Sequence, residues 1–309
     1  MKVNYICLDP GANPDGRGIY DKNLVRGLEA QGCVVQMIPL RVLGRELFSG
    51  PIWSLKVDPA SLAGLDRKAF TILSHETVFS AAEAVRPDLL IAHNYPPNFL
   101  WPQNVLFQSA YRWRALGAFR RASKFSKQLL VLSERERRAA QAQLDIDVFA
   151  EPPGVRVDGA ADLPIDVNLL RRSGSMDWMP KRRSLIKPED LAKMRQGMPE
   201  LQVADCEGKR GFLLIEDQFL SGFKLKLLDG LFRGDFVLSR ADLADEIQWL
   251  GLAPTGFEHV PDWGRVALAP LQARFLAELP GDFVSSRAAF LAARFSWTEI
   301  AGRVLEKAA

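Results

Sequence analysis

The sequence has few residues of the kinds that build disulfide frameworks or metal centres. Its 309 residues include three cysteines and three histidines. Cys7, Cys33 and Cys206 show neither CxxC nor Cys/His spacing, which disfavours a disulfide scaffold and a zinc site and favours a reducing compartment. We therefore expect no metal and no resident cofactor.

Long apolar runs and a strong net charge are also missing. No run approaches the roughly 18–20 apolar residues that cross a bilayer, and the first residues pass into a strand pattern without a signal-peptide region. The 40 basic and 37 acidic side chains leave a formal charge of +3, which gives no reason to expect a nucleic-acid partner. These observations predict a cytoplasmic protein.

What the chain does contain is a repeated alternation of apolar runs and helical patterns. With 48% hydrophobic residues, the chain can bury a large core, and we expect two domains. The Pro/Gly/Asp-rich stretch 152–165 is the best boundary between them. Strand, loop and helix succeed one another in both halves, which is typical of doubly wound parallel sheets.

The predicted elements of the first half are strands at 3–8, 34–40, 89–92, 128–132 and 148–150, and helices at 19–31, 77–85 and 111–127. In the second half, strands are predicted near 169, 201–204, 212–215 and 236–238, and 284–309 is predicted to be mainly helical. Ser133 and Glu136 form a capping box that opens another helix, and Ser239 with Asp242 repeats this design.

Two places in the first half are candidate ligand contacts. Gly16-Arg17-Gly18 is not a dinucleotide GxGxxG, because Asp21 stands where the third glycine would be. We interpret it as a loop that lets a substrate approach, with a plain βα turn as the alternative. His93 follows strand 89–92 at its carboxyl end, where open α/β sheets place their ligands; a purely structural histidine is the alternative.

The strongest signal in the second half is the stretch after the apolar run 212–215. Ser221-Gly222 is predicted to open an amphipathic helix with Lys224 and Lys226 in its first turns, and a helix N-terminus suits a phosphate. Asp229 would accept from a ribose or sugar hydroxyl. An ordinary exposed, serine-capped helix is the alternative.

One segment of the first half contains no acidic residues. Residues 89–133 contain no Asp or Glu, and 111–127 carries six basic residues among aromatics. As a helix, this segment would suit an anionic membrane surface, where each cation contributes on the order of 1 kcal/mol. A solvated basic helix is the alternative.

Two motifs resemble the retaining nucleotide-sugar glycosyltransferases of GT-B fold, family 4. Residues 174–180 (GSMDWMP) are similar to the Gly-Ser-Met-Asp-Trp-x-Pro start of the family's donor domain. Residues 221–229 (SGFKLKLLD) are similar to its Ser-Gly-Thr-Arg-Leu-Lys-Ile-Leu-Glu donor motif. Weaker matches are Ser133-Glu134 with 152–155, and the Phe-Ser-Trp at 295–297.

The resemblance implies an α/β chain with two Rossmann-like, doubly wound parallel-sheet domains facing across a cleft. Residues 1–160 would form the acceptor-side domain and 161–293 the nucleotide-sugar donor domain, with a terminal helix at 294–309 packing back on the first. Between Pro180 and Phe212 the family has more sequence, so the donor domain is abridged.

Residue by residue, the resemblance implies that Lys226 binds the donor diphosphate, with Lys181 as a second contact. Asp229, one methylene shorter than the family's Glu, would accept from the ribose, and His93 would be the catalytic histidine near the sugar. The implied donor-binding set is Gly16, Gly18, Ser175, Lys181, Ser221, Gly222, Lys226 and Asp229.

The implied function is transfer of a sugar from a nucleotide-sugar to a glycan or lipid-linked acceptor in bacterial polysaccharide or glycolipid biosynthesis, with retention. Residues 111–127 would bring the protein to the inner membrane as a peripheral contact. Two alternatives remain: a non-catalytic GT-B relative, and another α/β nucleotide-binding enzyme such as a dehydrogenase, which the missing GxGxxG disfavours.

Overall fold

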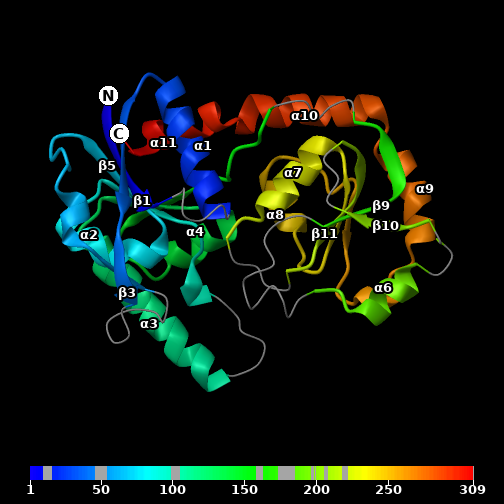
Figure 1. Ribbon diagram of the computed structural model, residues 1–309, viewed down its shortest axis with the longest axis horizontal. Coiled ribbons are helices and arrows are strands. Elements are labelled where there is room, and N and C mark those ends of the chain that lie inside the picture. Colours follow the sequence, from blue (N-terminus) through cyan, green and yellow to red (C-terminus); the bar gives the residue numbers. More distant parts are fainter. Residues whose placement is uncertain are drawn as a thin grey trace. The chain divides into compact units, whose positions relative to one another are not determined.

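The computed structural model describes residues 1–9, 16–45, 54–98, 105–157, 163–172, 185–195, 198, 200–204, 208–217 and 222–308. The chain divides into two compact units. Unit 1 contains Met1–Gly154, Ser221–Phe223 and Trp297–Ala309, and unit 2 contains Val155–Leu220 and Lys224–Ser296. Both are α/β, each with a parallel sheet and helices (Figure 1).

The elements of unit 1 are β1 (Lys2–Leu8), α1 (Gly16–Ala30), β2 (Val34–Leu40), β3 (Val42–Arg45), β4 (Leu55–Val57), η1 (Pro59–Leu62), β5 (Phe70–Ser74), η2 (Glu76–Ala81), α2 (Ala82–Val85), β6 (Leu89–Ala92), η3 (Pro96–Asn98), α3 (Val105–Ser123), β7 (Gln128–Val131), α4 (Glu134–Gln141), β8 (Asp147–Ala150) and α11 (Trp297–Ala308). The main sheet has the order β2-β1-β5-β6-β7-β8. Every pairing in it is parallel. The chain leaves β1 for β2 and later returns to the other side of β1 as β5, so the topological switch point lies between β1 and β5.

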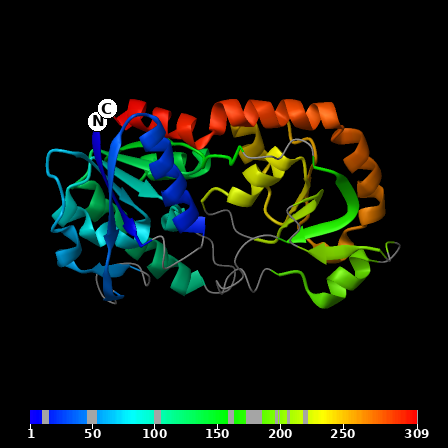
Figure 2. The ribbon, with the colours of Figure 1, turned by 45° about the horizontal axis from the view of Figure 1, so that its top comes forward.

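Helices α1 and α11 lie side by side, although they come from opposite ends of the chain (Figure 2). Gly27 makes this close approach feasible, because a Cβ there would be 2.3 Å from the carbonyl oxygen of Trp297. Glu151 pairs with Arg303 at 2.9 Å and with Lys307 at 2.6 Å. Both packing and charge thus join α11 to unit 1.

The elements of unit 2 are β9 (Ile165–Arg172), α6 (Pro188–Met194), β10 (Gln202–Ala204), β11 (Arg210–Ile215), α7 (Leu225–Arg233), β12 (Phe236–Ser239), α8 (Ala244–Trp249), β13 (Phe257–His259), η4 (Trp263–Arg265), α9 (Leu268–Glu278) and α10 (Gly281–Phe295). The parallel sheet has the order β10-β9-β11-β12-β13, so its switch point lies between β9 and β11. Every residue of β11 is buried, as expected of a central strand with both faces covered. Phe212, Phe236 and Phe275 pack edge to face or tilted in its core.

The predicted strands of both halves are confirmed, and three helix predictions are corrected. The segment expected to be a helix at 77–85 is a 3-10 helix followed by one turn of α-helix, and the strand before it, β5, was missed. Ser239 ends β12 and donates to the carbonyl of Ala241, so it caps no helix. The first helix begins at Gly16 rather than Ile19, which places both Gly16 and Gly18 in its first turn.

Candidate active site

Four buried polar side chains meet at the switch point of unit 1. Tyr5 lies in β1, Asp21 in α1, Ser74 at the end of β5, and His93 directly after β6. Tyr5 Oη donates to Asp21 Oδ1 at 2.7 Å, and Ser74 Oγ donates to the same oxygen at 2.6 Å. His93 Nε2 lies 3.1 Å from Ser74 Oγ and 3.7 Å from Asp21 Oδ1. The histidine predicted from its place after a strand is therefore the end of a buried hydrogen-bonded chain.

This chain has one consistent direction of donation. A serine hydroxyl carries one hydrogen, and Ser74 directs it to Asp21. Ser74 Oγ must therefore accept from His93, which requires the hydrogen on Nε2 and leaves Nδ1 for another contact. The network assigns a tautomer to the candidate catalytic side chain.

The His93 ring is held by aromatic neighbours as well. Its centroid lies 4.6 Å from that of Tyr20 and 5.0 Å from that of His75, both in tilted contacts. Tyr20 in turn meets Trp297 edge-on at 5.2 Å. His75 adopts a left-handed backbone, φ 85°, which is uncommon for a non-glycine residue and is often found near functional sites.

Asp21 is the electrostatic centre of this cluster. Burial by itself raises the pKa of its carboxyl, but the nearby imidazole of His93, whose Nε2 lies 3.7 Å away, and the hydrogen bonds from Ser74 and Tyr5 outweigh burial and lower the pKa below its usual value. The same environment raises the pKa of Tyr5, because its hydroxyl is buried and faces Asp21. The carboxylate therefore stays ionised while Tyr5 stays a donor.

The backbone around His93 is fixed by a second carboxylate. Glu76 Oε2 accepts from the backbone N–H of His93 at 3.0 Å and of Asn94 at 3.3 Å. Glu76 Oε1 also accepts from Asn94 Nδ2 at 3.0 Å. Side chain and main chain of His93 are thus positioned by separate acidic residues.

Gly222, another predicted site residue, lies against this backbone within unit 1. Its φ is 62°, and a Cβ there would be 2.4 Å from the carbonyl oxygen of His93 and 2.9 Å from Asn94 Oδ1. Only glycine fits both the backbone conformation and the space. The structure therefore brings together Gly222 and His93, which the sequence placed in different halves.

In unit 2, a charged pair marks the switch point between β9 and β11. Arg172, the last residue of β9, donates to both carboxylate oxygens of Glu216 at 3.0 and 2.7 Å. Glu216 also accepts from the backbone N–H of Ile186 at 2.7 Å. Next to it, Asp217 lies 3.8 Å from Lys224 Nζ. Lys224, which was predicted to lie in the first turns of a phosphate-binding helix, is therefore paired with an acid.

The helix predicted to start at Ser221-Gly222 starts later, at Leu225, with Lys224 as its N-cap residue and no side-chain cap. Lys226 is the second residue of this helix and is half-buried. Asp229 is half-exposed, and its carboxylate lies 3.9 Å from the guanidinium of buried Arg171. Lys226 and Asp229 both lie in the first five residues of α7.

Other predicted residues cannot be placed. Ser175, Lys181 and Ser221 lie outside the described residues. Gly16 begins α1, and Gly18 is buried in its first turn.

Sequence reasoning missed Asp21, Ser74, His75 and Glu76. The signal that would have found the last three is the apolar, β-branched run 70–73, whose carboxyl end leads to them.

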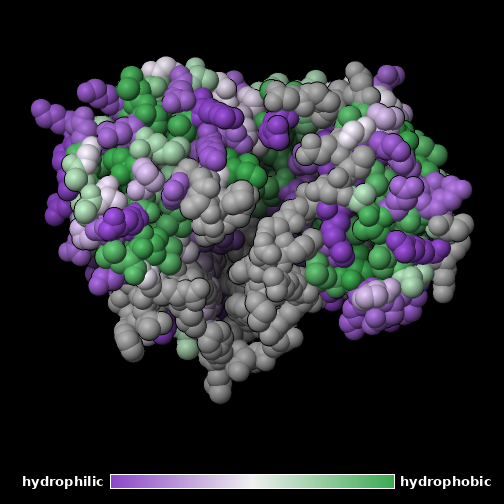
Figure 3. Space-filling model, in the orientation of Figure 1, coloured by the Kyte–Doolittle hydropathy of each residue, from purple (hydrophilic) through white to green (hydrophobic). Residues whose placement is uncertain are grey.

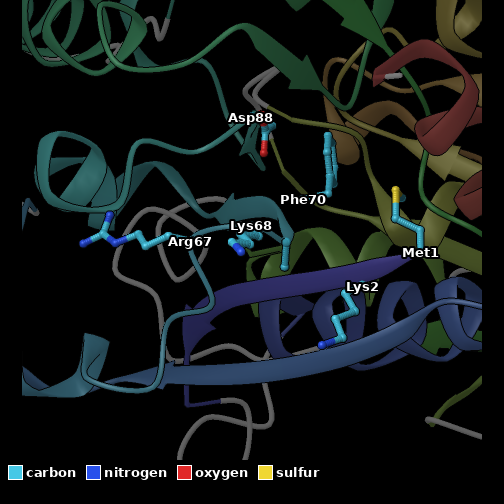
Figure 4. A pocket seen from close by; sticks show the side chains of 7 residues that line it. Met1, Lys2, Arg67, Lys68, Phe70 and Asp88 are labelled. Atoms are coloured by element: carbon cyan, nitrogen blue, oxygen red, sulfur yellow. The ribbon is translucent and has the colours of Figure 1, made fainter.

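In unit 1, a cavity of about 560 Å³ lies at the amino ends of the sheet strands, opposite the edge that carries His93. It is lined by residues at the amino ends of β1, β5 and β6: Met1, Lys2, Arg67, Lys68, Ala69, Phe70 and Asp88. Figure 4 shows the Arg67 side chain turned away from Lys2 and Asp88, and its guanidinium donates to the carbonyl of Ala84. Parallel sheets bind ligands at their carboxyl edge, so we place the candidate site at His93 and not at this cavity.

The described part of the chain lacks two features. No group of three or more His, Cys, Asp or Glu residues there could hold a metal ion. No helix in the described ranges is long and apolar enough to span a membrane. On the face drawn in Figure 3, hydrophilic and hydrophobic areas are interspersed.

The two parallel sheets with their helices give the chain the GT-B fold. Among solved structures, the chain is similar to sucrose-phosphate synthase from Thermosynechococcus elongatus, with a TM-score of 0.67 and 14% identity over 99% of this chain and 98% of that one. It is also similar to Anabaena HepE in complex with UDP-glucose, with a TM-score of 0.57 and 11% identity over 99% of both chains. A kitacinnamycin glycotransferase gives a TM-score of 0.51 and 12% identity over 99% and 98% of the two chains. No family model and no curated protein matches the sequence.

Proposed function

We propose that the chain is a glycosyltransferase that transfers a sugar from a nucleotide-sugar, with unit 2 as the donor unit and unit 1 as the acceptor-side unit. The observation that carries the proposal is the GT-B fold combined with polar side chains at the carboxyl edges of both sheets. In open α/β sheets, this is where ligands bind. The HepE structure, which shares the fold, contains UDP-glucose.

In this proposal, α7 receives the donor. Breaking a sugar–phosphate bond leaves negative charge on a diphosphate, and helix N–H groups with a lysine stabilise that charge as it develops. Lys226 would contact the diphosphate and Asp229 the ribose. His93, with its hydrogen fixed on Nε2, would act at the sugar through Nδ1. The proposal includes what the sequence resemblance implies: retention, a glycan or lipid-linked acceptor, and a role in polysaccharide or glycolipid assembly.

The first test is donor binding. Purified protein is screened by thermal unfolding with UDP-glucose and the other common nucleotide-sugars. A donor at 100 times its dissociation constant should stabilise the fold by about 2.7 kcal/mol. Lys226→Ala should abolish this shift, while Lys187→Ala, an exposed lysine of the same unit, should leave it intact. No shift with any donor would contradict the proposal.

The second test separates an enzyme from a non-catalytic relative. Consumption of the donor that binds is measured with wild type and with His93→Ala. Loss of a positioned acid–base or polar group typically costs about 10²–10⁴ in rate, so the variant should bind the donor but turn it over at least a hundredfold more slowly. Binding without any turnover by the wild type would favour the non-catalytic alternative.

We also propose that α3 contacts an anionic membrane surface. Tyr111, Ala115 and Phe119 form its buried face. Trp113 in the middle of the helix is 77% exposed. Arg121 near the end of the helix and Lys124, the first residue after it, are also exposed. An exposed tryptophan beside cations is typical of interfacial helices.

Binding to vesicles of phosphatidylcholine with phosphatidylglycerol tests the membrane contact. Arg121→Glu with Lys124→Glu should weaken binding, whereas Lys187→Glu with Arg265→Glu in unit 2 changes the net charge equally and should not. Equal loss in both double variants would point to bulk charge instead of this helix.

A further inference from the structure

Glu136 joins two loops that carry predicted site residues. It lies in α4, and 2% of the residue is exposed. Its Oε1 accepts from the backbone N–H of Tyr95 at 2.8 Å and from the backbone N–H of Gly222 at 2.7 Å. One carboxylate oxygen thus holds the loop after β6 and the turn that precedes α7 in the chain.

This use of Glu136 differs from the capping box predicted for it. Ser133 Oγ does accept from the backbone N–H of Glu136, at 3.3 Å, which confirms the serine cap. The glutamate side chain, however, points to Tyr95 and Gly222. Its other oxygen, Oε2, is buried without a hydrogen-bond partner among the described residues.

Glu136 and Glu76 lie in two different helices and both accept hydrogen bonds from the backbone of the loop after β6. Glu76 in η2 accepts from His93 and Asn94, and Glu136 in α4 accepts from the next residue, Tyr95. The steric contact of Gly222 with the carbonyl of His93 closes the arrangement. Without Glu136, two buried N–H groups would lose their acceptor, which is costly.

The environment makes this carboxyl sensitive to pH near neutrality. Burial raises the pKa of Glu136 to about 7, although the N–H groups of Gly222 and Tyr95 and the charge of Arg135 lower it, and Glu76 adds to the rise. The titratable groups that interact electrostatically with it are Glu76 from η2, Arg135 from its own helix and Tyr95 from the loop after β6. An ionised carboxylate accepts N–H bonds about twice as strongly as a neutral group.

We propose that Glu136 is a positioning residue, which holds the Gly222 turn against the backbone of His93 and so sets the pH range in which the donor binds. The positioning of the turn is independent of the proposed function, and only the statement about donor binding rests on it. The N–H of Gly222 lowers the pKa of this carboxyl, so by linkage the ionised form holds the turn more strongly than the protonated form does. For a group with a pKa of about 7, the ionised fraction falls about tenfold from pH 8 to pH 6.

The first measurement needs no ligand. Hydrogen exchange of the Gly222 and Tyr95 amides, expressed as protection relative to the intrinsic rate, is compared at pH 6 and pH 8. Wild type should gain about tenfold in protection at pH 8. Glu136→Gln keeps the shape but cannot ionise, so its protection should be low and equal at both pH values. Glu134→Gln, in the same helix but paired with Arg137 and Arg138, is the matched control and should behave as wild type.

The second measurement is the affinity for UDP-glucose at the same two pH values. From pH 8 to pH 6, the affinity of wild type and of Glu134→Gln should fall about tenfold. This fall is measured relative to the change that Glu136→Gln shows over the same pH range. A flat protection profile in wild type overturns the proposal even if the glutamine variant does not fold, and so does a pH effect that persists in Glu136→Gln. If protection changes as expected but no variant binds any nucleotide-sugar, positioning of the turn stands and the proposed function fails.

Discussion

The carbonyl oxygen of His93 lies so close to Gly222 that a Cβ on residue 222 would be only 2.4 Å from it. The two residues are far apart in the sequence, yet both belong to unit 1. This contact fixes how the turn before α7 meets the loop after β6.

Gly222→Ala tests the contact. A side chain at φ 62° costs roughly 1–2 kcal/mol of backbone energy, and the clash with a backbone oxygen adds to this cost. Gly32→Ala is the control, because Gly32 has φ 79° and nothing within 4 Å of its Cβ position. Chemical denaturation should show the larger loss for Gly222→Ala. Equal losses would mean that the His93 loop moves aside freely.

Ser74→Ala tests the hydrogen-bond direction at His93. Without the hydroxyl, the Nε2–H of His93 loses its acceptor and Asp21 loses a donor, which should cost roughly 1–3 kcal/mol. The tautomer is measured by ¹H–¹⁵N correlation of the labelled imidazole. Wild type should show the hydrogen on Nε2, and the variant should show a mixture. Ser80→Ala, whose hydroxyl donates to the carbonyl of Leu55, should leave the imidazole signals unchanged.

Asp21→Asn should change how stability depends on pH. Because the pKa of Asp21 is lowered in the folded state, its ionised form stabilises the fold at every pH above its unfolded value. That contribution is lost as the pH falls through the lowered folded value. Urea denaturation at several pH values should therefore show a free energy of unfolding that is lower in the variant by roughly 1–3 kcal/mol at pH 7. This difference between variant and wild type should become smaller in strong acid. Asp145→Asn, at an exposed acid, serves as control; parallel curves for wild type and Asp21→Asn would refute the expectation.

Gly27→Ala and Gly117→Ala place the same methyl group in two helices of unit 1. At Gly27 it would meet the backbone of Trp297 at 2.3 Å, and overpacking of this kind costs about 1–3 kcal/mol. Gly117 in α3 has open space, so alanine there should stabilise the helix by up to about 1 kcal/mol. Thermal unfolding of the two variants should move in opposite directions. A neutral Gly27→Ala would show that α1 and α11 can separate without loss.

The sequence was sufficient to predict the parallel sheets, because their strands are continuous apolar runs with clear turn residues between them. It was also sufficient to find His93, since the end of strand β6 is visible as a change from apolar to polar residues. The strand β5 was missed because the segment before it lacks regular patterning, and with it His75 and Glu76 were lost.

Long-range partners could not be predicted in the same way. Ser133 and Glu136 fit a local capping rule, and nothing in their spacing reveals that the carboxylate instead reaches Gly222. Asp21 attracted notice only as a departure from a glycine motif, since its partners Tyr5 and Ser74 are brought to it by the sheet order. The onset of α7 was predicted too early because Gly222, with its positive φ, belongs to a turn and not to the helix.

Because Trp297–Ala309 belongs to unit 1 together with the first half of the chain, the order of synthesis on the ribosome matters. When the first 154 residues have emerged, the surface of α1 around Gly27 is still bare, and Glu136 has no Gly222 to hold. Unit 1 can complete its core only after α11 has emerged as well. Truncation before Trp297 should therefore destabilise unit 1 more than unit 2, although the residues just before the cut belong to unit 2.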